Sequence, residues 1–592
     1  MSAKLRTTQI SRRSFLRAAT LLGGTALLAA CQQAPAPAAK PADSAAAKPA
    51  DARPAAPAVT TVPAAPAAAA PTAAPAAAAK PADAAKPADA AKPTAAPAAA
   101  AGAPKKGGTL NYAEAADFTH FSPWSVTPPN QGIYNQVFNR LLWKDGTGKE
   151  HPDIGESWEM AKDGLSFTVK MKQGVKWHDG KEHVADDYVK MLGYTRDENL
   201  LKDPAVKKHQ GLVGPVKEVK AVDKYTVQFI FGTPVPFITE LLDYWYAVRI
   251  DDPADPAFTK TPPVGTGPFK LAKWQPTQFA QLPKNPDYFV KDQPYLDEMM
   301  FKRLEKAETL IPNLQSGGVD GIQVTSAADV AGLKDNPNVT LELNENTGSI
   351  FDLLVNVSKP PLDKKEVRQA LAFSLNRAEM AKTAFFGVSK PISSPFYNPN
   401  SMAYREDLVN YYAFDLDKAG KMLEQAGVKG LELTGIVTPR WPQMKLFMLL
   451  WQADLAKIGV KMTVTEVEIA KYYDYGADSK MLGADLIPWL NARTTRDPAI
   501  LFNTQGNFRG NERNVFGYRS ADLEKLIADG AVELDPAKRK TIYQKANEIM
   551  VTDANLIYVA TDPRIWAFTK PVKGVTYDLS GNMALGGAYL DK

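Results

Sequence analysis

The spacing of apolar positions predicts both strands and helices in the larger, C-terminal part of the chain. Apolar and polar residues alternate over 167–171 and 225–230, which is typical of half-buried strands. Over 367–375 and 418–426 the apolar residues recur at helical spacing, and Gly427 follows the second run as a helix C-cap would. This mixture predicts an α/β fold in which helices cover sheets.

A second set of elements follows in the next part of the chain. The pattern predicts a strand over 431–437, an amphipathic helix over 446–458 and a strand over 460–467. Arg440 and Trp441 fall between the first strand and the helix, so we expect them in a loop. Loops positioned by a rigid scaffold are where ligand-contacting side chains are concentrated.

The first hundred residues follow a different pattern. An apolar run over 18–30 is preceded by five basic residues and no acidic one, which is the layout of an export signal. Such a run is too short to cross a hydrocarbon core of ~30 Å as a helix. Residues 32–106 are almost entirely Ala and Pro with scattered Lys and Asp, and so have too little bulky apolar surface to form a core. We therefore predict a signal peptide over 1–30 and a disordered linker over 31–106.

Cys31 is the only cysteine of the chain and ends the apolar run. Residues 28–31, Leu-Ala-Ala-Cys, resemble the bacterial lipobox, whose cysteine becomes the lipidated first residue of the mature protein. Residues 11–17 resemble the twin-arginine export signal. The alternative is an ordinary signal peptide with a chance cysteine. We expect Cys31 to anchor an exported protein to the outer face of the cytoplasmic membrane, and a single cysteine allows no internal disulfide.

The charge of the chain is unevenly divided. Residues 1–106 contain 13 Lys and Arg and 4 Asp, so the body from residue 107 onward has a formal charge of −4, although the whole chain has +5. This mildly acidic body argues against a nucleic-acid partner. The body also exceeds the roughly 250–300 residues of a single hydrophobic core, so we expect two or more lobes.

Short motifs along the body resemble a known family in their order and spacing. They stand at residues 107–110, 154–159, 163–169, 174–180, 185–187, 265–269, 284–289, 367–371 and 458–460. Together they resemble the family 5 extracellular solute-binding proteins, the dipeptide-, oligopeptide- and nickel-binding receptors of ATP-driven importers. The resemblance covers nearly all of 107–592. Read by its residues alone, the Gly-Thr-Gly-Pro of 265–268 predicts a tight crossing where only small residues fit.

The resemblance implies a two-lobed α/β fold of the periplasmic-binding-protein type, with a hinge and a ligand cleft between the lobes. The implied limits are residues 107–150, 263–352 and 556–592 for lobe I, residues 151–262 for an extra subdomain of lobe I, and residues 353–555 for lobe II. The chain is implied to cross the hinge near 351–356 and again near 558–561.

The body lacks a set of residues that would form a catalytic centre. It has no Gly-x-Ser-x-Gly elbow and no cysteine that could act as a nucleophile. The segment 146–150 lacks the first glycine and the final Ser or Thr of a phosphate-binding loop. We therefore expect a protein that is not an enzyme and needs no cofactor. An anchored peptidase or glycosidase is the alternative, and turnover of a hydrolysable ligand would support it.

Two polar pairs are expected to be structural. His178 and His183 are five residues apart and flank a predicted turn, so they do not share a helical face, and we expect no metal site there. Asp186 and Asp187 are expected at the first turn of a helix, where the helix dipole favours negative charge, rather than as an acid/base pair.

The resemblance implies a ligand-contacting segment that begins at Trp489. Peptide-binding members have a tryptophan followed three residues later by an aspartate, which pairs with the α-ammonium of the peptide, and then an Asp-Pro or Glu-Pro. Here Ala492 stands at the aspartate position, and Asp497-Pro498 lies about two residues farther on than in the family. Asp497 either replaces the missing aspartate or is a turn residue before proline.

Arg493 and Arg496 add positive charge to this segment. They either hold a carboxylate or phosphate of the ligand or are solvated, and the hypothesis that follows is a neutral or anionic ligand group at this point. Aromatic rings are further expected walls of the cleft, with core packing as the alternative for each. The expected ligand-contacting side chains are thus Trp489, Arg493, Arg496, Asp497, Trp441, Arg440, Trp124, Tyr134 and Tyr518.

These observations predict a lipoprotein that captures a solute by lobe closure and delivers it to the permease and ATPase subunits of an ABC importer. Peptide is the cargo class that the family favours. Oligosaccharides, anionic solutes and metal chelates are alternatives, as is a ligand sensor or chaperone with the same fold and no transport. We expect a monomer.

Overall fold

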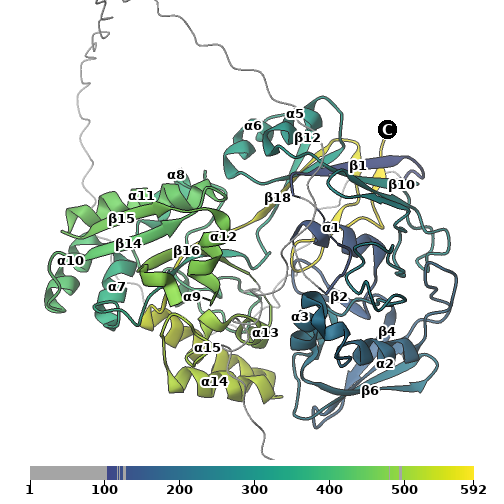
Figure 1. Ribbon diagram of the computed structural model, residues 1–592, viewed down its shortest axis with the longest axis horizontal. Coiled ribbons are helices and arrows are strands. Elements are labelled where there is room, and N and C mark those ends of the chain that lie inside the picture. The colour runs from purple at the N-terminus through teal and green to yellow at the C-terminus, as the bar shows by residue number, and fades with distance from the viewer. Residues whose placement is uncertain (1–102, 117, 119, 125–127, 479, 493–495) are drawn as a thin grey trace, which may run out of the picture. The chain divides into compact units, whose positions relative to one another are not determined.

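Three larger sheets, with four to seven strands each, and their helices organise the described part of the chain (Figure 1). The computed structural model describes residues 103–592 apart from 117, 119, 125–127, 479 and 493–495. Cys31, the predicted signal peptide and the linker up to residue 102 therefore lie outside the described residues. Contacts join the described residues into one unit.

The sheet of lobe I has seven strands in the order β12-β18-β11-β1-β10-β9-β8. Its central strand β1 runs parallel to β10 and β11, and the remaining pairs are antiparallel. The strands are β1 (Thr109–Glu114), β8 (Lys273–Gln275), β9 (Phe279–Pro283), β10 (Glu298–Arg303), β11 (Gly321–Val324), β12 (Val339–Asn344) and β18 (Arg564–Thr569). Two short helices, α5 (Leu310–Gln315) and α6 (Val330–Lys334), form a small core with β11 and β18.

An antiparallel sheet in the order β4-β5-β7-β6 lies within residues 151–262, the range expected for the extra subdomain of lobe I. Its elements are β4 (Gly155–Met160), β5 (Ser166–Met171), α2 (Ala185–Tyr194), α3 (Pro204–Val213), β6 (Val216–Asp223) and β7 (Thr226–Phe231). In β5 and β7 buried residues alternate with more exposed ones, which confirms the strands predicted from alternation. Asp187 accepts hydrogen bonds from the Val184 amide (3.0 Å) and Trp177 Nε1 (3.1 Å) at the start of α2, so the prediction of a helix-initiating pair with Asp186 is also confirmed.

Further short helices and strands complete lobe I. They are α1 (Pro128–Val137), β2 (Leu142–Lys144), β3 (Glu150–Pro152) and α4 (Ile238–Leu242), with the two-stranded pairs β19 (Val572–Lys573) with β22 (Tyr589–Leu590) and β20 (Thr576–Tyr577) with β21 (Met583–Ala584). Helix α4, the residue after it and the turn between β20 and β21 supply the acidic side chains of the site described below.

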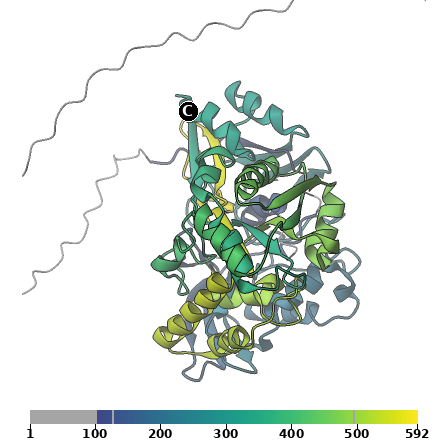
Figure 2. The ribbon, with the colours of Figure 1, turned by 90° about the vertical axis from the view of Figure 1, so that its left-hand side faces the viewer.

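Lobe II is built on a five-stranded sheet in the order β15-β14-β16-β13-β17. The strands are β13 (Ile350–Val355), β14 (Glu432–Val437), β15 (Lys461–Glu466), β16 (Leu486–Asn491) and β17 (Leu556–Thr561). The helices are α7 (Lys365–Phe373), α8 (Arg377–Thr383), α9 (Glu406–Val409), α10 (Leu416–Gln425), α11 (Pro442–Lys457), α12 (Ile469–Tyr473), α13 (Pro498–Thr504), α14 (Ala521–Val532) and α15 (Pro536–Asp553). Helices α14 and α15 lie side by side in both ribbon views (Figure 2).

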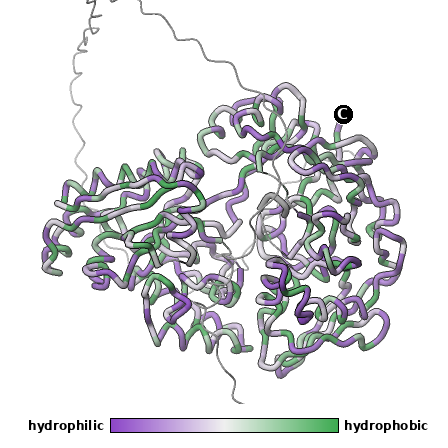
Figure 3. The backbone as a smooth tube through the Cα atoms, in the orientation of Figure 1, coloured by the Kyte–Doolittle hydropathy of each residue, from purple (hydrophilic) through white to green (hydrophobic). Residues whose placement is uncertain are grey.

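The helices and strands predicted in lobe II are present with small shifts at their ends. Helix α10 ends just before Gly427, whose φ of 72° matches the predicted C-cap. Helix α11 begins four residues earlier than predicted because Pro442 occupies its first turn, where proline is favoured. Hydrophobic and hydrophilic residues are intermixed along the backbone of the body (Figure 3). The buried residues of α11 recur at helical spacing, so this helix packs one face on the core: Met444, Phe447, Met448, Trp451 and Leu455. Among the described residues, no helix is both long and apolar enough for a bilayer.

The chain passes between the two large sheets twice. It leaves β12 and enters β13 through residues 345–349, and it returns from β17 to β18 through residues 562–563. The Asp562 amide donates to Ser349 O (2.9 Å) and Thr347 Oγ1 donates to Asp562 O (3.0 Å), so the crossings are bonded to each other. The crossings thus directly adjoin the two segments near which they were expected, 351–356 and 558–561. Those segments themselves are largely strands of lobe II, whose buried residues pair inside its sheet.

Gly265 and Gly267 lie where the chain meets the C-terminal end of α1. A Cβ on Gly265 would stand 2.0 Å from Val137 O, and one on Gly267 would stand 2.5 Å from Gln136 O. The Gly267 amide donates to Val137 O at 2.9 Å. Backbone therefore packs directly on backbone, and the predicted tight crossing is confirmed.

Candidate ligand-binding site

Strand β16 places Trp489 in an aromatic cluster of lobe II. Its ring stacks on that of Tyr472 with centroids 5.4 Å apart and an interplanar angle of 13°. Trp441, at the start of α11, lies 5.7 Å from the same tyrosine ring, and the Arg440 guanidinium lies 5.4 Å from the Trp441 ring. The structure thus brings Trp489, Trp441 and Arg440 together, through Tyr472 of α12, which the sequence analysis did not single out.

A pocket of about 420 Å³ opens beside Trp489. Its wall includes the end of β16 as far as Ala492, the loop that follows α13, and Arg513. Among the described residues that line it, Arg513 has the only charged side chain, and it is in no ion pair with a described carboxylate. The pocket therefore offers one exposed cation, a large ring and several amides.

Amide side chains hold the loop after α13 against β16. Gln505 Nε2 donates to Ala492 O (2.6 Å), and Asn507 Nδ2 donates to Asn491 Oδ1 (3.2 Å). Asn491 Nδ2 in turn donates to Asp352 Oδ2 (2.6 Å), whose carboxyl group is fully buried in β13. Burial raises the pKa of Asp352 to about 8, even though the bond from Asn491 lowers it. Behind Asn491 of the pocket wall there is thus a carboxyl group whose raised pKa favours the protonated form at neutral pH.

Arg496 extends away from this pocket and into lobe I. Its Nη1 lies 2.5 Å from Asp243 Oδ2 and 3.2 Å from Glu240 Oε2, and its Nη2 donates to Ser580 Oγ at 2.8 Å. The side chain is 2% exposed. It is therefore neither solvated nor free to hold a ligand anion, which corrects both readings of this arginine made from the sequence.

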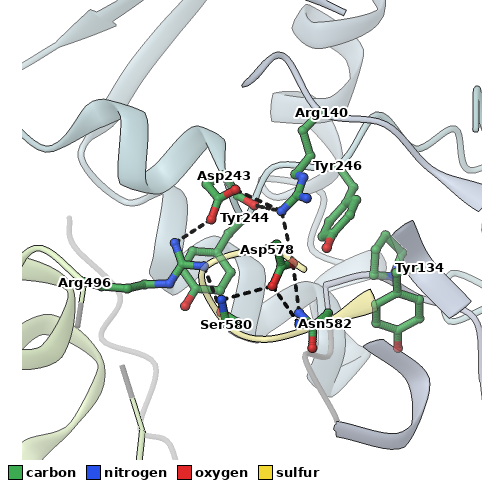
Figure 4. Close-up of a pocket in the computed structure, with 10 residues that line it drawn as sticks. Tyr134, Arg140, Asp243, Tyr244, Tyr246, Arg496, Asp578, Ser580 and Asn582 are labelled. Carbon is green, nitrogen blue, oxygen red and sulfur yellow. Dashed lines mark hydrogen bonds and ion pairs between the residues drawn. The ribbon is translucent and has the colours of Figure 1, made fainter. Parts of the chain in front are cut away.

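Asp243 is held from two sides (Figure 4). Arg140 Nη1 lies 2.9 Å from its Oδ1 and 3.6 Å from Asp578 Oδ2, while Arg496 approaches the other oxygen of Asp243. Burial raises the pKa of Asp243, but Arg496 and Arg140 outweigh burial and hold this pKa below its usual range. The space left among these groups is about 10 Å³, about enough for one water molecule.

Asp497 is fully engaged inside lobe II. It caps α13 by accepting from the Ala499 amide (2.9 Å), and it forms a two-pronged ion pair with Arg539 of α15, whose Nη2 lies 2.7 Å from Asp497 Oδ1. The Arg539 side chain is 4% exposed. Of the two roles considered from the sequence, the structure favours that of a structural residue before Pro498.

The other expected cleft residues lie in cores. Trp124 stacks on His209 at 4.7 Å and is 1% exposed, and Tyr518 is buried with its hydroxyl donating to Asp553 Oδ2 at 2.6 Å. Tyr134 is buried on α1 beside the small cavity at Arg140. These three aromatic side chains are buried in hydrophobic cores, so they do not line the pocket of about 420 Å³ beside Trp489. Arg493 lies outside the described residues.

A second pocket, of about 310 Å³, lies between the lobes. One wall is the β2–β3 loop of lobe I with Lys144 and Glu240, and the other includes residues 398–402 and Lys540 of lobe II. Asn400 Nδ2 donates across it to Thr147 O at 3.1 Å. Because both lobes contribute walls, this pocket changes shape whenever the lobes move.

Sequence reasoning missed Asp243, Glu240 and Arg513. No motif marks them, although the run Asp243-Tyr-Trp-Tyr combines an acid with three aromatic rings and could have indicated a polar site.

His183 is buried with neither ring nitrogen bonded, and the described residues contain no cluster of three or more metal-ligating side chains.

Comparison with known proteins shows which family this chain resembles. A family model described as bacterial extracellular solute-binding proteins, family 5 Middle, matches residues 149–511. The dipeptide-binding protein of Escherichia coli is 28% identical over 477 residues, which cover 75% of this chain and 87% of that protein. Heme-binding protein A of Haemophilus influenzae is 27% identical over 482 residues, covering 77% and 87%.

Solved structures agree with the fold. The ABC transporter-associated periplasmic binding protein DppA from Helicobacter pylori, in complex with a peptide, superposes with a TM-score of 0.68 at 25% identity, covering 82% of this chain and 99% of that chain. The expected two-lobed α/β fold is thereby confirmed. Because the family model spans more than half of the chain, this protein belongs to the bacterial extracellular solute-binding proteins of family 5.

Proposed function

We propose that this protein is the solute receptor of an ABC importer and that peptides are its cargo class. The observation that supports this most directly is the pocket of about 420 Å³ beside Trp489, in a chain whose relatives include dipeptide-, di/tripeptide- and glutathione-binding proteins. Peptides suit a site with a ring for contact area and amides for orientation. Lobe closure on the bound solute then presents the receptor to a permease and its ATPase.

The pocket chemistry narrows the class of peptide. Ala492 occupies the position at which peptide-binding members have the ammonium-binding aspartate, and Asp497 is engaged with Arg539. The one charged side chain among the described lining residues is Arg513, whose planar guanidinium suits a carboxylate. The ligand group beside Trp489 is therefore neutral or anionic, such as a blocked amino end or a carboxylate.

Calorimetry with matched peptides tests this proposal. Each peptide is offered free, N-acetylated and C-amidated, after native mass spectrometry of protein purified from its own host has identified what co-purifies. We expect N-acetylation to leave the affinity largely intact and loss of the carboxylate to weaken binding. Arg513→Met should reduce affinity for carboxylates and spare neutral ligands. A strong preference for the free amine would overturn the assignment of the ligand group, and failure to bind any peptide would overturn the cargo class.

An anionic non-peptide solute is the second candidate, because the same arginine would bind it. Adding organic acids and glycosides to the calorimetric panel separates the two classes: tight binding of a non-peptide acid, with no peptide bound, would favour this second candidate. Turnover of any bound solute by the pure protein would contradict a role confined to binding.

We further propose that the protein works as a monomer anchored by lipid on Cys31, with residues 32–106 as a tether to the membrane. The tether would raise the effective concentration of the receptor near its permease. Cys31→Ser should release the protein from the membrane and leave solute affinity unchanged. Uptake that is undiminished after release would contradict the role of the tether, and the binding assignment would be unaffected.

A further inference from the structure

A cation of lobe II is buried in an acidic pocket of lobe I. The residues around the Arg496 guanidinium, Asp243, Glu240, Tyr244 and Ser580, all belong to lobe I. Tyr244 places its ring 4.2 Å from the guanidinium carbon, which adds a cation–π contact to the two carboxylates. Figure 4 shows Arg496 entering from the yellow-green ribbon of lobe II and pointing at Asp243.

Lobe I builds this acidic pocket from its own residues. Asp243 Oδ1 accepts from Arg140 Nη1 (2.9 Å) and from the Lys144 amide (3.1 Å), and Lys144 Nζ lies 2.5 Å from Glu240 Oε1. Each carboxylate thus has one oxygen fixed inside lobe I and the other turned to Arg496. Lobe I therefore contributes its own bonds to both carboxylates, besides those that Arg496 makes.

The buried carboxylates of the pocket outnumber the buried cations that lobe I supplies. Three buried carboxylates, Asp243, Glu240 and Asp578, face two buried cations of lobe I, Arg140 and Lys144. Arg496 makes the numbers of buried carboxylates and buried cations equal. Lys144 Nζ also lies 3.4 Å from Glu150 Oε1, but the Glu150 side chain is 33% exposed and is solvated. If the lobes closed without Arg496, a carboxylate would be buried unpaired, which is strongly unfavourable, whereas in an open form water would solvate the pocket.

We propose that lobe I contains a guanidinium-binding site whose occupant is Arg496 of the same chain, and that this contact holds the lobes closed in the absence of ligand. A ligand that binds the closed form then loses less binding free energy to the opening–closing equilibrium, because the closed state is already populated. That effect on affinity rests on the proposed receptor function, whereas ligand-free closure does not.

Small-angle scattering of the ligand-free body tests the proposal. Wild type should be as compact as expected for closed lobes, and Arg496→Met should show a larger radius of gyration with an unchanged circular dichroism spectrum. Arg405→Ala is the matched control, because Arg405 forms its ion pairs with Asp407 and Glu548 inside lobe II and should not affect closure. Equal radii for wild type and Arg496→Met would overturn the proposal.

Chemical rescue tests the identity of the occupant. In Arg496→Ala, millimolar guanidinium chloride should raise the melting temperature relative to sodium chloride at the same concentration, because the free cation can enter the emptied pocket. The same salt should not stabilise wild type, whose pocket is occupied. Absence of a difference between the two salts in the variant would overturn the guanidinium site. Neither measurement uses a peptide, so both results can be interpreted even if the protein proves not to bind peptides.

Discussion

Arg496 Nη1 lies 2.5 Å from Asp243 Oδ2, although the two residues belong to different lobes. The other oxygen of Asp243 is held by Arg140 of its own lobe at 2.9 Å. One carboxylate therefore serves both the internal packing of lobe I and the contact between lobes. A substitution of Asp243 disturbs both, and a substitution of Arg496 separates the second role from the first.

Replacing Asp497 should reveal two separable contributions to the stability of lobe II. Asp497→Asn keeps a good helix cap but leaves Arg539 buried without its partner, so we expect a loss of about 3 kcal/mol in the free energy of unfolding. Asp497→Ala also removes the cap, which should cost about 1 kcal/mol more. Urea denaturation of both variants measures the difference, and equal losses would show that the cap contributes nothing.

The Asp497→Asn variant also separates a structural from a ligand-binding role. Because Asp497 is engaged with Arg539, peptide affinity of the folded Asp497→Asn protein should stay within about threefold of wild type, less than 1 kcal/mol. A loss of a hundredfold or more, confined to peptides with a free amine, would instead identify Asp497 as the substitute for the aspartate that is absent at Ala492.

The crossing at Gly265 should tolerate no side chain. A Cβ would meet Val137 O at 2.0 Å, a backbone atom that cannot move aside alone, so we expect Gly265→Ala to lose about 3 kcal/mol or more, or to fail to fold. Gly193→Ala is the matched control: it lies near the end of α2 with open space around it and should gain about 0.5–1 kcal/mol. Thermal unfolding of both proteins checks the contrast.

The local pattern of apolar and polar residues predicted the helices and strands of lobe II well. Each of these elements buries one face, and residues such as Gly427 and Pro442 mark where its helices end or begin. The two crossings between the lobes were located only to within a few residues. Residues 351–356 and 558–561 are entirely buried and read as a passage between lobes, but they pair with each other as strands. Strand pairing between segments two hundred residues apart leaves no local trace in the sequence.

The residues of the candidate site also divide into those that the local sequence could identify and those that it could not. Trp489 and Trp441 were found because family position and a strand–loop–helix boundary pointed to them. Arg496 was singled out by its charge, yet its partner Asp243 lies 253 residues away and belongs to another lobe. Charge identifies a residue that needs a partner, and only the folded chain shows whether that partner is a ligand or a carboxylate of the same protein.

The buried carboxyl of Asp352 should make stability depend on pH. Its folded pKa of about 8 lies above the unfolded value of about 4, so the folded state holds the extra proton between these limits. The stabilisation from this group is complete below about pH 4 and is lost as the pH rises through about 8, by about 5 kcal/mol at most.

Asp352→Asn removes this titration while keeping an oxygen that can accept from Asn491. We expect the variant to gain stability relative to wild type as the pH is raised from 5 to 8, measured by urea denaturation at both values. The comparison with wild type cancels the other buried carboxyls with raised pKa values, such as Glu114 and Asp562. A constant difference between the two proteins would show that Asp352 does not titrate in this range.

Trp489 should contribute far more to ligand binding than the neighbouring Trp441. Both rings lie against Tyr472, but of the two Trp489 alone lines the pocket of about 420 Å³. Removing a large ring from a binding pocket typically costs about 2 kcal/mol or more, so Trp489→Ala should weaken binding about 30-fold. Trp441→Ala should change affinity less than threefold, or well under 1 kcal/mol, and Trp489→Phe should recover part of the loss. Calorimetry with the tightest-binding peptide provides the comparison, and a larger effect at Trp441 would move the binding site to the other side of Tyr472.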